Sequence, residues 1–292
     1  MRFPFTGVIP VDKPGGVTSR RVVDVVARAL GMAAVGHAGT LDPLAEGVVV
    51  VVCGHATKLV DYVHALPKHY RAGFLLGRSS PSDDFETTVT EEPDPRIPTA
   101  AELAAGLGPL RGDILQRPCD FSAVHVDGKR AYRLARKGRT IELAAKPVRI
   151  ERLEVVAYDW PRLDLDIECS SGTFVRAIGR DLAAALGTTA VMAALVRKAV
   201  GPFVHDRSLP LDAVTPDAVR EALLAPLAAV PRLPRLVLDG DRLATAIRGG
   251  LLPLDETADA VAAVDGGGEL VGILRRHESS RYRLRPNFRG AG

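Results

Sequence analysis

The residues best suited to chemistry lie in one short segment, GHAGTLDP at residues 36–43. Asp42 precedes a proline, which holds its backbone extended, and the two glycines allow turns or a close approach to a ligand. An ordinary aspartate has a pKa of about 3.9, so at neutral pH its carboxylate can act as a nucleophile or a base. By pattern alone, the commoner interpretation is that Asp42-Pro43 only begins a turn.

The sequence lacks the motifs that other kinds of chemistry need. The sequence has no Walker-type phosphate loop, and Gly266–Gly268 is typical of a hairpin turn. It has no HExxH motif and no paired His or Cys spacing, so we expect no metal site. Cys53, Cys119 and Cys169 are widely spaced without a CxxC pair, which favours a reducing, cytoplasmic compartment. Carboxylate chemistry without a cofactor remains.

The elements that must position Asp42 mix helix and strand patterns without strict βαβ order. Capping residues and apolar spacing predict helices over residues 19–30, from 99 onward and over 173–186. Apolar alternation and β-branched runs predict strands over residues 7–12, 48–53, 70–76, 163–169, 261–264, 270–274 and 282–284. We expect a loop over 36–47, an acidic surface excursion over 79–98, and a strand, a turn and a basic helix over 124–139. The mixture favours an α+β fold with an antiparallel or mixed sheet.

Length and composition limit the class of protein. The chain has 292 residues, 47% of them hydrophobic, which permits a sizeable core. We expect a large domain over 1–229 and a small one over 230–292, divided at a proline-bracketed linker. Apolar runs such as Val48–Cys53 are far shorter than the ~20 residues of a membrane helix, so we expect no membrane partner.

The charge is nearly balanced overall but unevenly distributed. The net charge is +3, yet residues 129–139 hold six basic residues and no acid, and residues 275–289 hold six arginines and one glutamate. Such patches fit a polyanionic partner. A solvated basic face is the alternative.

Six blocks of sequence carry a more specific signal: VDKPGGVTS (11–19), VGHAGTLDPLAEGVVVVVCGHATK (35–58), KHYRAGFLLG (68–77), FSAVHVDGKRAYRLARKGR (121–139), CSSGTFVRAIGRDLAAALG (169–187) and LVRKAVGPF (195–203). Together, and in this order, they resemble the TruB family of tRNA pseudouridine synthases. The resemblance covers nearly all of residues 7–205. It implies the pseudouridine synthase fold, a mixed or antiparallel central sheet flanked by helices, followed by a small β-rich PUA-like RNA-binding domain. Members of this family isomerise uridine 55 in the TΨC loop of tRNA, after flipping the base and without metal or cofactor.

The resemblance also implies roles for three residues. Asp42 would be the catalytic aspartate, attacking either the flipped base or its ribose. Arg176, from the GTxxR block, would pair with Asp42 and favour its ionised form. Tyr70 would stack on the flipped uracil. The simpler alternative for Arg176 is a surface arginine of an amphipathic helix. For Tyr70 it is a half-buried tyrosine of a strand.

Seven further positions match residues that bind or support the RNA in the family: His37, Phe174, Leu195, Lys13, Lys58, Lys129 and Arg130. For Lys13 and Lys58 the alternative is that they support the structure or are simply solvated. For Leu195 the alternative is an ordinary core position. Phe174 stands where the family usually has tyrosine, so the aromatic plane is kept and the hydroxyl is lost. His125 replaces a usual lysine, and Cys119 replaces a frequent proline.

The expected partner is tRNA, bound through its TΨC stem-loop by a monomer that needs no nucleotide cofactor. In the small domain the arginines at positions 275, 276, 281, 283 and 285 would contact the acceptor-arm backbone, unless this domain only caps the catalytic sheet. Two other functions compete with catalysis. One is a non-catalytic RNA-binding or tRNA-folding module, and the other a place in a guide-RNA complex, which the short bacterial-type layout disfavours.

Overall fold

The structure is a computed structural model that describes residues 3–121, 125–126, 129–130, 143–278 and 280–289. The helices are α1 (Ser19–Leu30), α2 (Val60–His64), α3 (Ala100–Gly106), α5 (Val175–Ala185), α6 (Pro216–Ala222) and α7 (Gly240–Ile247). The strands of the larger sheet are β1 (Gly7–Lys13), β2 (Val35–Ala38), β3 (Glu46–Cys53), β4 (Lys68–Leu76), β7 (Gly112–Gln116), β10 (Lys146–Asp159), β11 (Arg162–Cys169), β12 (Ala190–Val200), β13 (Phe203–Val204) and β14 (Leu209–Pro210). Those of the smaller sheet are β15 (Arg235–Val237), β16 (Leu251–Pro253), β17 (Ala260–Val264), β18 (Leu270–Glu278) and β19 (Arg281–Asn287). Two short hairpins complete the set: β5 (Arg78–Ser79) with β6 (Thr90–Glu91), and β8 (His125–Val126) with β9 (Lys129–Arg130).

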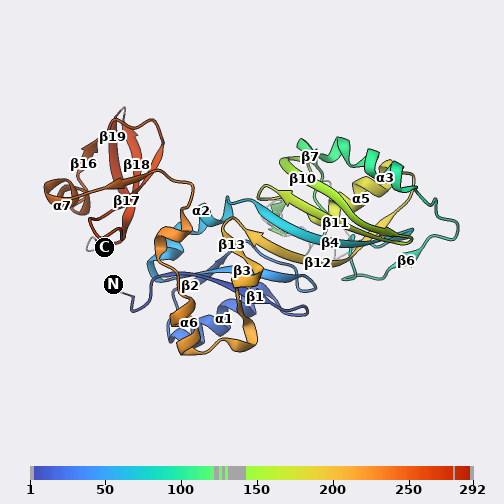
Figure 1. The fold of residues 1–292 in the computed structure, drawn as a ribbon, viewed down its shortest axis with the longest axis horizontal. Helices are drawn as coiled ribbons and strands as arrows, with labels where there is room; N and C mark the ends of the chain where they lie inside the picture. Colours follow the sequence, from blue (N-terminus) through green and yellow to red (C-terminus); the bar gives the residue numbers. More distant parts are fainter. Residues whose placement is uncertain (1–2, 122–124, 127–128, 131–142, 279, 290–292) are drawn as a thin grey trace.

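The larger sheet is mixed. Its strand order is β14-β1-β3-β12-β4-β11-β10-β7, with β2 paired to β3 and β13 to β12 (Figure 1). The β3–β12 and β1–β14 pairs are parallel and the other pairs are antiparallel. With helices packed on this sheet, the prediction of an α+β fold with a mixed sheet is confirmed.

Local sequence signals explain where the main helices begin and end. Thr18 caps α1 by accepting a hydrogen bond from the backbone of Arg21, and Gly31 ends the helix in the left-handed region. Thr99 and Glu102 form the predicted capping box of α3. The helix predicted from residue 173 is α5, which begins two residues later with Phe174 as its N-cap.

Helix α5 packs closely on β4. A Cβ atom added to Gly179 would lie 2.1 Å from the ring of Phe74, so only glycine permits this approach. The predicted alternation of β11 is confirmed, because Leu163, Leu165 and Ile167 are all buried in the same core. This packing brings the helix that carries Arg176 against the strand that carries Tyr70.

Two local predictions were wrong, and some strands were not predicted. Residues 36–38 belong to β2 rather than to a loop, because they pair with β3. The excursion 79–98 is not wholly on the surface, since Ser82 and Asp84 are buried. Strands β7 and β10 were missed because most of their residues are exposed or half-buried and give no clear alternation. In the segment 124–139 the strands β8 and β9 pair, whereas the turn at 127–128 and the helix beyond 130 lie outside the described residues.

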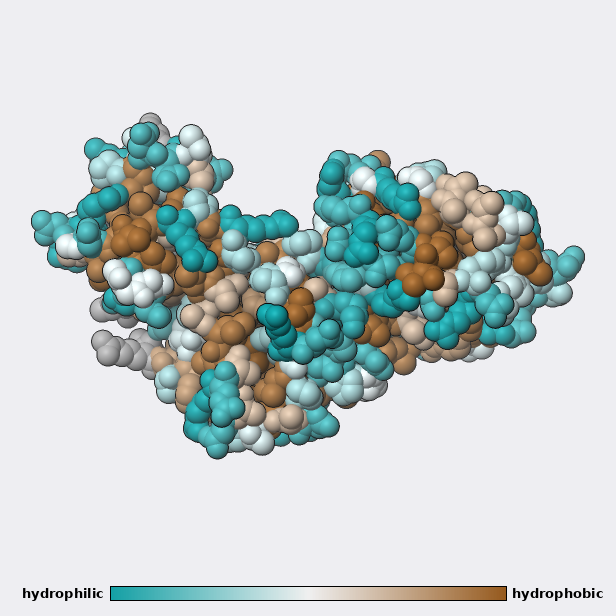
Figure 2. Space-filling model, in the orientation of Figure 1, coloured by the Kyte–Doolittle hydropathy of each residue, from teal (hydrophilic) through white to brown (hydrophobic). Residues whose placement is uncertain are grey.

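The smaller sheet contains the strands predicted near the C-terminus, in the order β15-β17-β18-β19-β16. Figure 2 shows it as a separate lobe, with a hollow between it and the larger part. At the base of this lobe, Val264 and Ile273 share a hydrophobic cluster with Val50 and Leu59 of the larger part. The guanidinium of Arg275 also lies 5.6 Å from the ring centre of Tyr62. Among the described residues, every helix is too short or too polar to cross a membrane.

Candidate functional site

Asp42 and Arg176 meet at the centre of the site. Nη2 of Arg176 lies 3.4 Å from Oδ2 of Asp42, and its Nη1 lies 3.0 Å from Oδ2 of Asp84. Arg176 and Asp84 are buried, whereas 43% of the Asp42 side chain is exposed. The arginine is thus fixed from inside by one carboxylate and presents its charge to a second carboxylate that a ligand can reach.

Backbone oxygens complete the coordination of this arginine. Arg176 donates to the carbonyls of Ser82, at 2.8 Å, and Phe121, at 2.9 Å. Ser82 belongs to the excursion between β5 and β6, and Phe121 follows β7. The guanidinium therefore ties two segments, far apart in sequence, to α5 beside Asp42.

The loop that carries Asp42 is held by buried side chains. Lys13 donates to the carbonyls of Pro14, Val17 and Pro43 at 2.7–3.1 Å. Ser19 donates to the Leu41 carbonyl at 3.0 Å and accepts from the Leu41 amide at 2.8 Å. These bonds fix the backbone on both sides of Asp42, so its carboxylate is preorganised.

Competing effects act on the acidity of Asp42. Burial of its carboxyl group raises its pKa, and the positive charge of Arg176 opposes this. The negative charges of Asp84 and Glu86 raise the pKa further, whereas Lys13 lowers it. The net pKa is raised, which makes the carboxylate more basic than an ordinary surface aspartate.

Tyr70 and Leu195 line the core next to this loop. They lie on the adjacent strands β4 and β12, both are 8% exposed, and both belong to one cluster with Leu41. Burial raises the pKa of Tyr70, and the negative charge of Asp42 is among the further causes. An aromatic ring and an aliphatic side chain thus stand close to the carboxylate.

Phe174 is half-buried at the N-terminus of α5, two residues before Arg176. Gln116 clamps its backbone, because the side-chain amide donates to the Phe174 carbonyl at 3.1 Å and accepts from its amide at 2.8 Å. These two hydrogen bonds fix the start of α5, and with it the direction in which Arg176 points.

The remaining candidates are more dispersed. His37 is half-buried on β2, and burial, followed by the charges of Arg197 and Arg20, lowers its pKa, so the imidazole is neutral at neutral pH. Lys13 is buried and bonded to carbonyls, the position expected for structural support. Lys58 is exposed. Lys129 and Arg130 lie on β9, and their side chains are outside the described part of the structure.

The C-terminal arginines have more internal partners than expected. Arg276 lies 3.3 Å from Asp259 and donates to the Glu256 carbonyl at 2.9 Å. Arg275 packs on Tyr62, as described above, whereas Arg281 and Arg285 are exposed. The basic patch therefore also makes contacts within its own domain and with the larger part of the chain.

Sequence reasoning missed several residues of the site. Asp84 and Ser82 lie in a segment whose acidic, threonine-rich composition is typical of a surface loop. Ser19 stood in the block VDKPGGVTS without a role of its own, and Gln116 had no recognised pattern. The sequence carried no signal for Asp84, because the burial of the Arg176 guanidinium, which calls for a second carboxylate, follows only from the structure.

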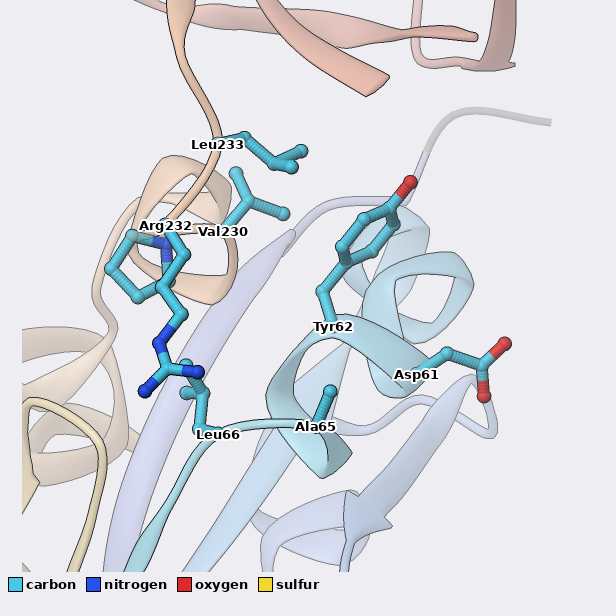
Figure 3. A pocket seen from close by; sticks show the side chains of 8 residues that line it. Asp61, Tyr62, Ala65, Leu66, Val230, Arg232 and Leu233 are labelled. Atoms are coloured by element: carbon cyan, nitrogen blue, oxygen red, sulfur yellow. The ribbon is translucent and has the colours of Figure 1, made fainter. Parts of the chain in front are cut away.

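A separate cavity of about 310 Å³ lies between α2 and residues 230–233. Figure 3 shows Val230 and Leu233 on one side and Tyr62 on the other. Its lining is mainly apolar and includes none of the residues around Asp42. Within the described ranges, no three His, Cys, Asp or Glu side chains are grouped as metal ligands.

Known proteins match this chain over much of its length. Residues 27–175 match the family described as "TruB family pseudouridylate synthase (N terminal domain)". The tRNA pseudouridine synthase B of Mycobacterium bovis (strain BCG / Pasteur 1173P2) is 39% identical over 290 residues, or 96% of each chain. That of Mycobacteroides abscessus is 39% identical over 273 residues, 92% of this chain and 91% of the relative.

Solved structures give the same fold. A Cbf5-Nop10-Gar1 complex contains a chain that aligns with a TM-score of 0.74 and 21% identity, covering 97% of this chain and 85% of that one. An H/ACA RNP bound to a substrate RNA containing 2'-deoxyuridine contains one with a TM-score of 0.72 and 21% identity, covering 97% and 84%. The pseudouridine synthase fold is thereby confirmed.

Proposed function

The chain belongs to the TruB family of pseudouridylate synthases, and on that premise we propose that it converts uridine 55 in the TΨC loop of tRNA to pseudouridine. The relatives that match along almost its whole length are tRNA pseudouridine synthases. The observation that carries the proposal is the Asp42–Arg176 pair, a partly exposed carboxylate on a clamped loop held 3.4 Å from a buried guanidinium. Because the proposed substrate is tRNA, the expected compartment is the cytoplasm. We expect the active form to be a monomer.

The reaction is an isomerisation, so its atoms balance within the nucleotide. The bond between C1′ of the ribose and N1 of uracil breaks, the uracil turns, and a bond between C1′ and C5 forms. The proton on C5 leaves and N1 gains a proton. Asp42 supplies the nucleophile that starts this sequence, by attacking either the base or the ribose.

The neighbouring residues support this attack. Arg176 keeps Asp42 ionised and oriented, since its charge opposes the effect of burial on the carboxyl pKa. Tyr70 and Leu195 offer surfaces on which an extruded uracil packs, and Tyr70 replaces the stacking that the base loses. We assign to the Tyr70 hydroxyl a part in removing the proton from C5.

Binding of the RNA uses other parts of the chain. We assign contacts with the TΨC stem-loop to His37, Phe174 and the β9 residues Lys129 and Arg130, with Lys58 at the edge. Lys13 supports the site from beneath the Asp42 loop. Residues 230–292 act as the second RNA-binding domain, through exposed arginines such as Arg281 and Arg285.

The test uses two tRNA transcripts that differ only at position 55. The purified protein is incubated with the natural transcript and with one that has cytidine at that position, and pseudouridine is mapped along both. We expect modification at position 55 of the first and none in the second. Modification at another uridine would contradict the assignment of position 55, and no modification of either would contradict the enzymatic function.

A further inference from the structure

Arg197 is the most deeply buried large cation next to the Asp42 loop that the proposed mechanism leaves without a role. Its side chain is 1% exposed on β12. Nε donates to the Val48 carbonyl at 2.7 Å, Nη1 to the Thr40 carbonyl at 3.3 Å and Nη2 to the Gly39 carbonyl at 3.1 Å. Because these carbonyls precede and follow Asp42 in sequence, one side chain fixes both ends of the loop.

The register of the sheet explains how one residue reaches both sides. Strand β12 lies between β3 and β4, and Arg197 is paired with Gly47 on one neighbour and with Tyr70 on the other. Gly47 has a φ of +99°, and an added Cβ would lie 2.3 Å from the Arg197 carbonyl. Only glycine permits this backbone approach, which brings the end of the Asp42 loop directly onto Arg197.

Arg197 also contacts the tyrosine. Arg197 lies opposite Tyr70 in the register of β12 and β4, and its charge lowers the pKa of Tyr70 against the larger, raising effect of burial. The same side chain therefore bonds the loop of the proposed nucleophile and lies beside the tyrosine proposed to assist proton removal.

The chemistry of these contacts is unusual for a buried arginine. Its three hydrogen-bond acceptors are all neutral backbone carbonyls. Burying a cation on neutral acceptors is costly unless its donors are well satisfied. A core that needed only stability would be served as well by an aliphatic side chain.

We propose that Arg197 is a positioning residue, which holds the Asp42 loop and Tyr70 in a fixed relation to each other. This inference rests on the proposed roles of Asp42 and Tyr70. It assigns Arg197 no contact with the substrate. Its removal therefore affects the chemical step more than the binding of tRNA.

The test compares Arg197→Met and Arg197→Lys with the matched control Arg111→Met. Arg111 also donates to a carbonyl, that of Leu153, but it lies beside the edge strand β7. For each variant we measure tRNA affinity, the single-turnover rate of pseudouridine formation, the unfolding temperature, and amide hydrogen exchange over residues 39–48. The exchange measurement reports on the loop whether or not the protein is active.

For Arg197→Met we expect a single-turnover rate about 100-fold lower, the loss typical of a displaced catalytic group, with tRNA affinity within about twofold. Arg197→Lys keeps the charge but not the fork of donors, so we expect a partial loss of about tenfold. In both variants, exchange over residues 39–48 becomes faster, while Arg111→Met matches the natural protein. Because Arg197 lowers the pKa of Tyr70, the rise of the rate with pH that reports ionisation of Tyr70 moves to higher pH in Arg197→Met.

Three results would overturn the inference. One is a folded Arg197→Lys variant with the natural rate, pH profile and loop exchange. Another is a rate that falls only in proportion to the folded fraction, which indicates a merely structural role. The third is an equal loss in tRNA affinity and in rate. If the natural protein forms no pseudouridine, the proposed function fails instead, and faster loop exchange in Arg197→Lys then still supports the positioning of the loop.

Discussion

Asp84 is buried against Arg176, with its Oδ2 atom 3.0 Å from Nη1. This inner carboxylate holds the guanidinium whose other nitrogen faces Asp42 at 3.4 Å. The orientation of the proposed nucleophile therefore depends on a residue that is shielded from the ligand.

Replacing Asp84 tests this dependence. Asp84→Ala leaves Arg176 buried with one of its two carboxylate partners gone, so we expect a loss of about 3 kcal/mol in the free energy of unfolding. We expect a lower single-turnover rate with tRNA affinity nearly unchanged. Denaturant unfolding, a rate assay and a binding assay measure the three quantities.

Asp217→Ala is the matched control, since Asp217 pairs with Arg220 on the surface, where a pair contributes little. An Asp84→Ala protein with natural stability and rate would show that the buried pair has no role in the site.

Arg176 sets the pH range in which Asp42 is ionised. Its charge lowers the pKa of Asp42, so Arg176→Met raises that pKa. Activity needs the ionised form and is lost as pH falls through the pKa, so the acid limb of the pH–rate profile moves to higher pH. We also expect a rate at neutral pH about 100-fold lower.

Single-turnover rates between about pH 5 and about pH 8 show this shift. Arg180→Met serves as control, because Arg180 lies one helical turn along α5 and pairs with Asp83 and Asp181 instead. An acid limb that stays in place, or moves to lower pH, would contradict the coupling of Arg176 to Asp42.

Phe174 tests whether an aromatic plane is sufficient at the start of α5. Phe174→Ala removes a stacking surface worth about 1–3 kcal/mol, so we expect tRNA affinity or kcat/KM to fall about tenfold or more. Phe174→Tyr restores the family's usual residue and should keep kcat/KM within about twofold. Steady-state kinetics measure both, and a gain of more than about tenfold in Phe174→Tyr would show that the hydroxyl has a role of its own.

Lys129 and Arg130 test the electrostatic part of RNA binding. Each phosphate contact releases counterions, so replacing both residues with alanine should weaken tRNA binding and flatten its salt dependence by a slope of about 2. Binding isotherms at several salt concentrations give the slope. Arg149→Ala, whose guanidinium is paired with Asp113 at 2.7 Å, is the control. An unchanged slope in the double variant would reject both residues as phosphate contacts.

The sequence predicts those parts of the fold that depend on neighbouring residues. Thr18 with Gly31, and Thr99 with Glu102, mark the ends of helices because caps are local. The alternation along residues 163–169 likewise marks β11. In contrast, β10 has an irregular burial pattern with two register shifts, so its residues give no clean period.

The residues of the site likewise divide into those that local sequence identifies and those that depend on contacts between distant segments. Asp42, Tyr70 and Arg176 could be selected because they stand in specific sequence blocks, and the structure brings Asp42 and Arg176 into contact. Asp84 and Arg197 act through contacts between distant segments, which follow from strand register and chain path. Arg197 stood inside a recognised block, but its reach to Gly39 and Val48 depends on the position of β12 between two other strands.

The central claim is that the Asp42 carboxylate performs the reaction. Asp42→Asn keeps the size and most of the contacts of this side chain and removes its negative charge. With tRNA transcript in excess and protein freed of any deamidated fraction, we predict no pseudouridine at position 55, together with tRNA affinity close to that of the natural protein. Full pseudouridine formation by Asp42→Asn would contradict the account.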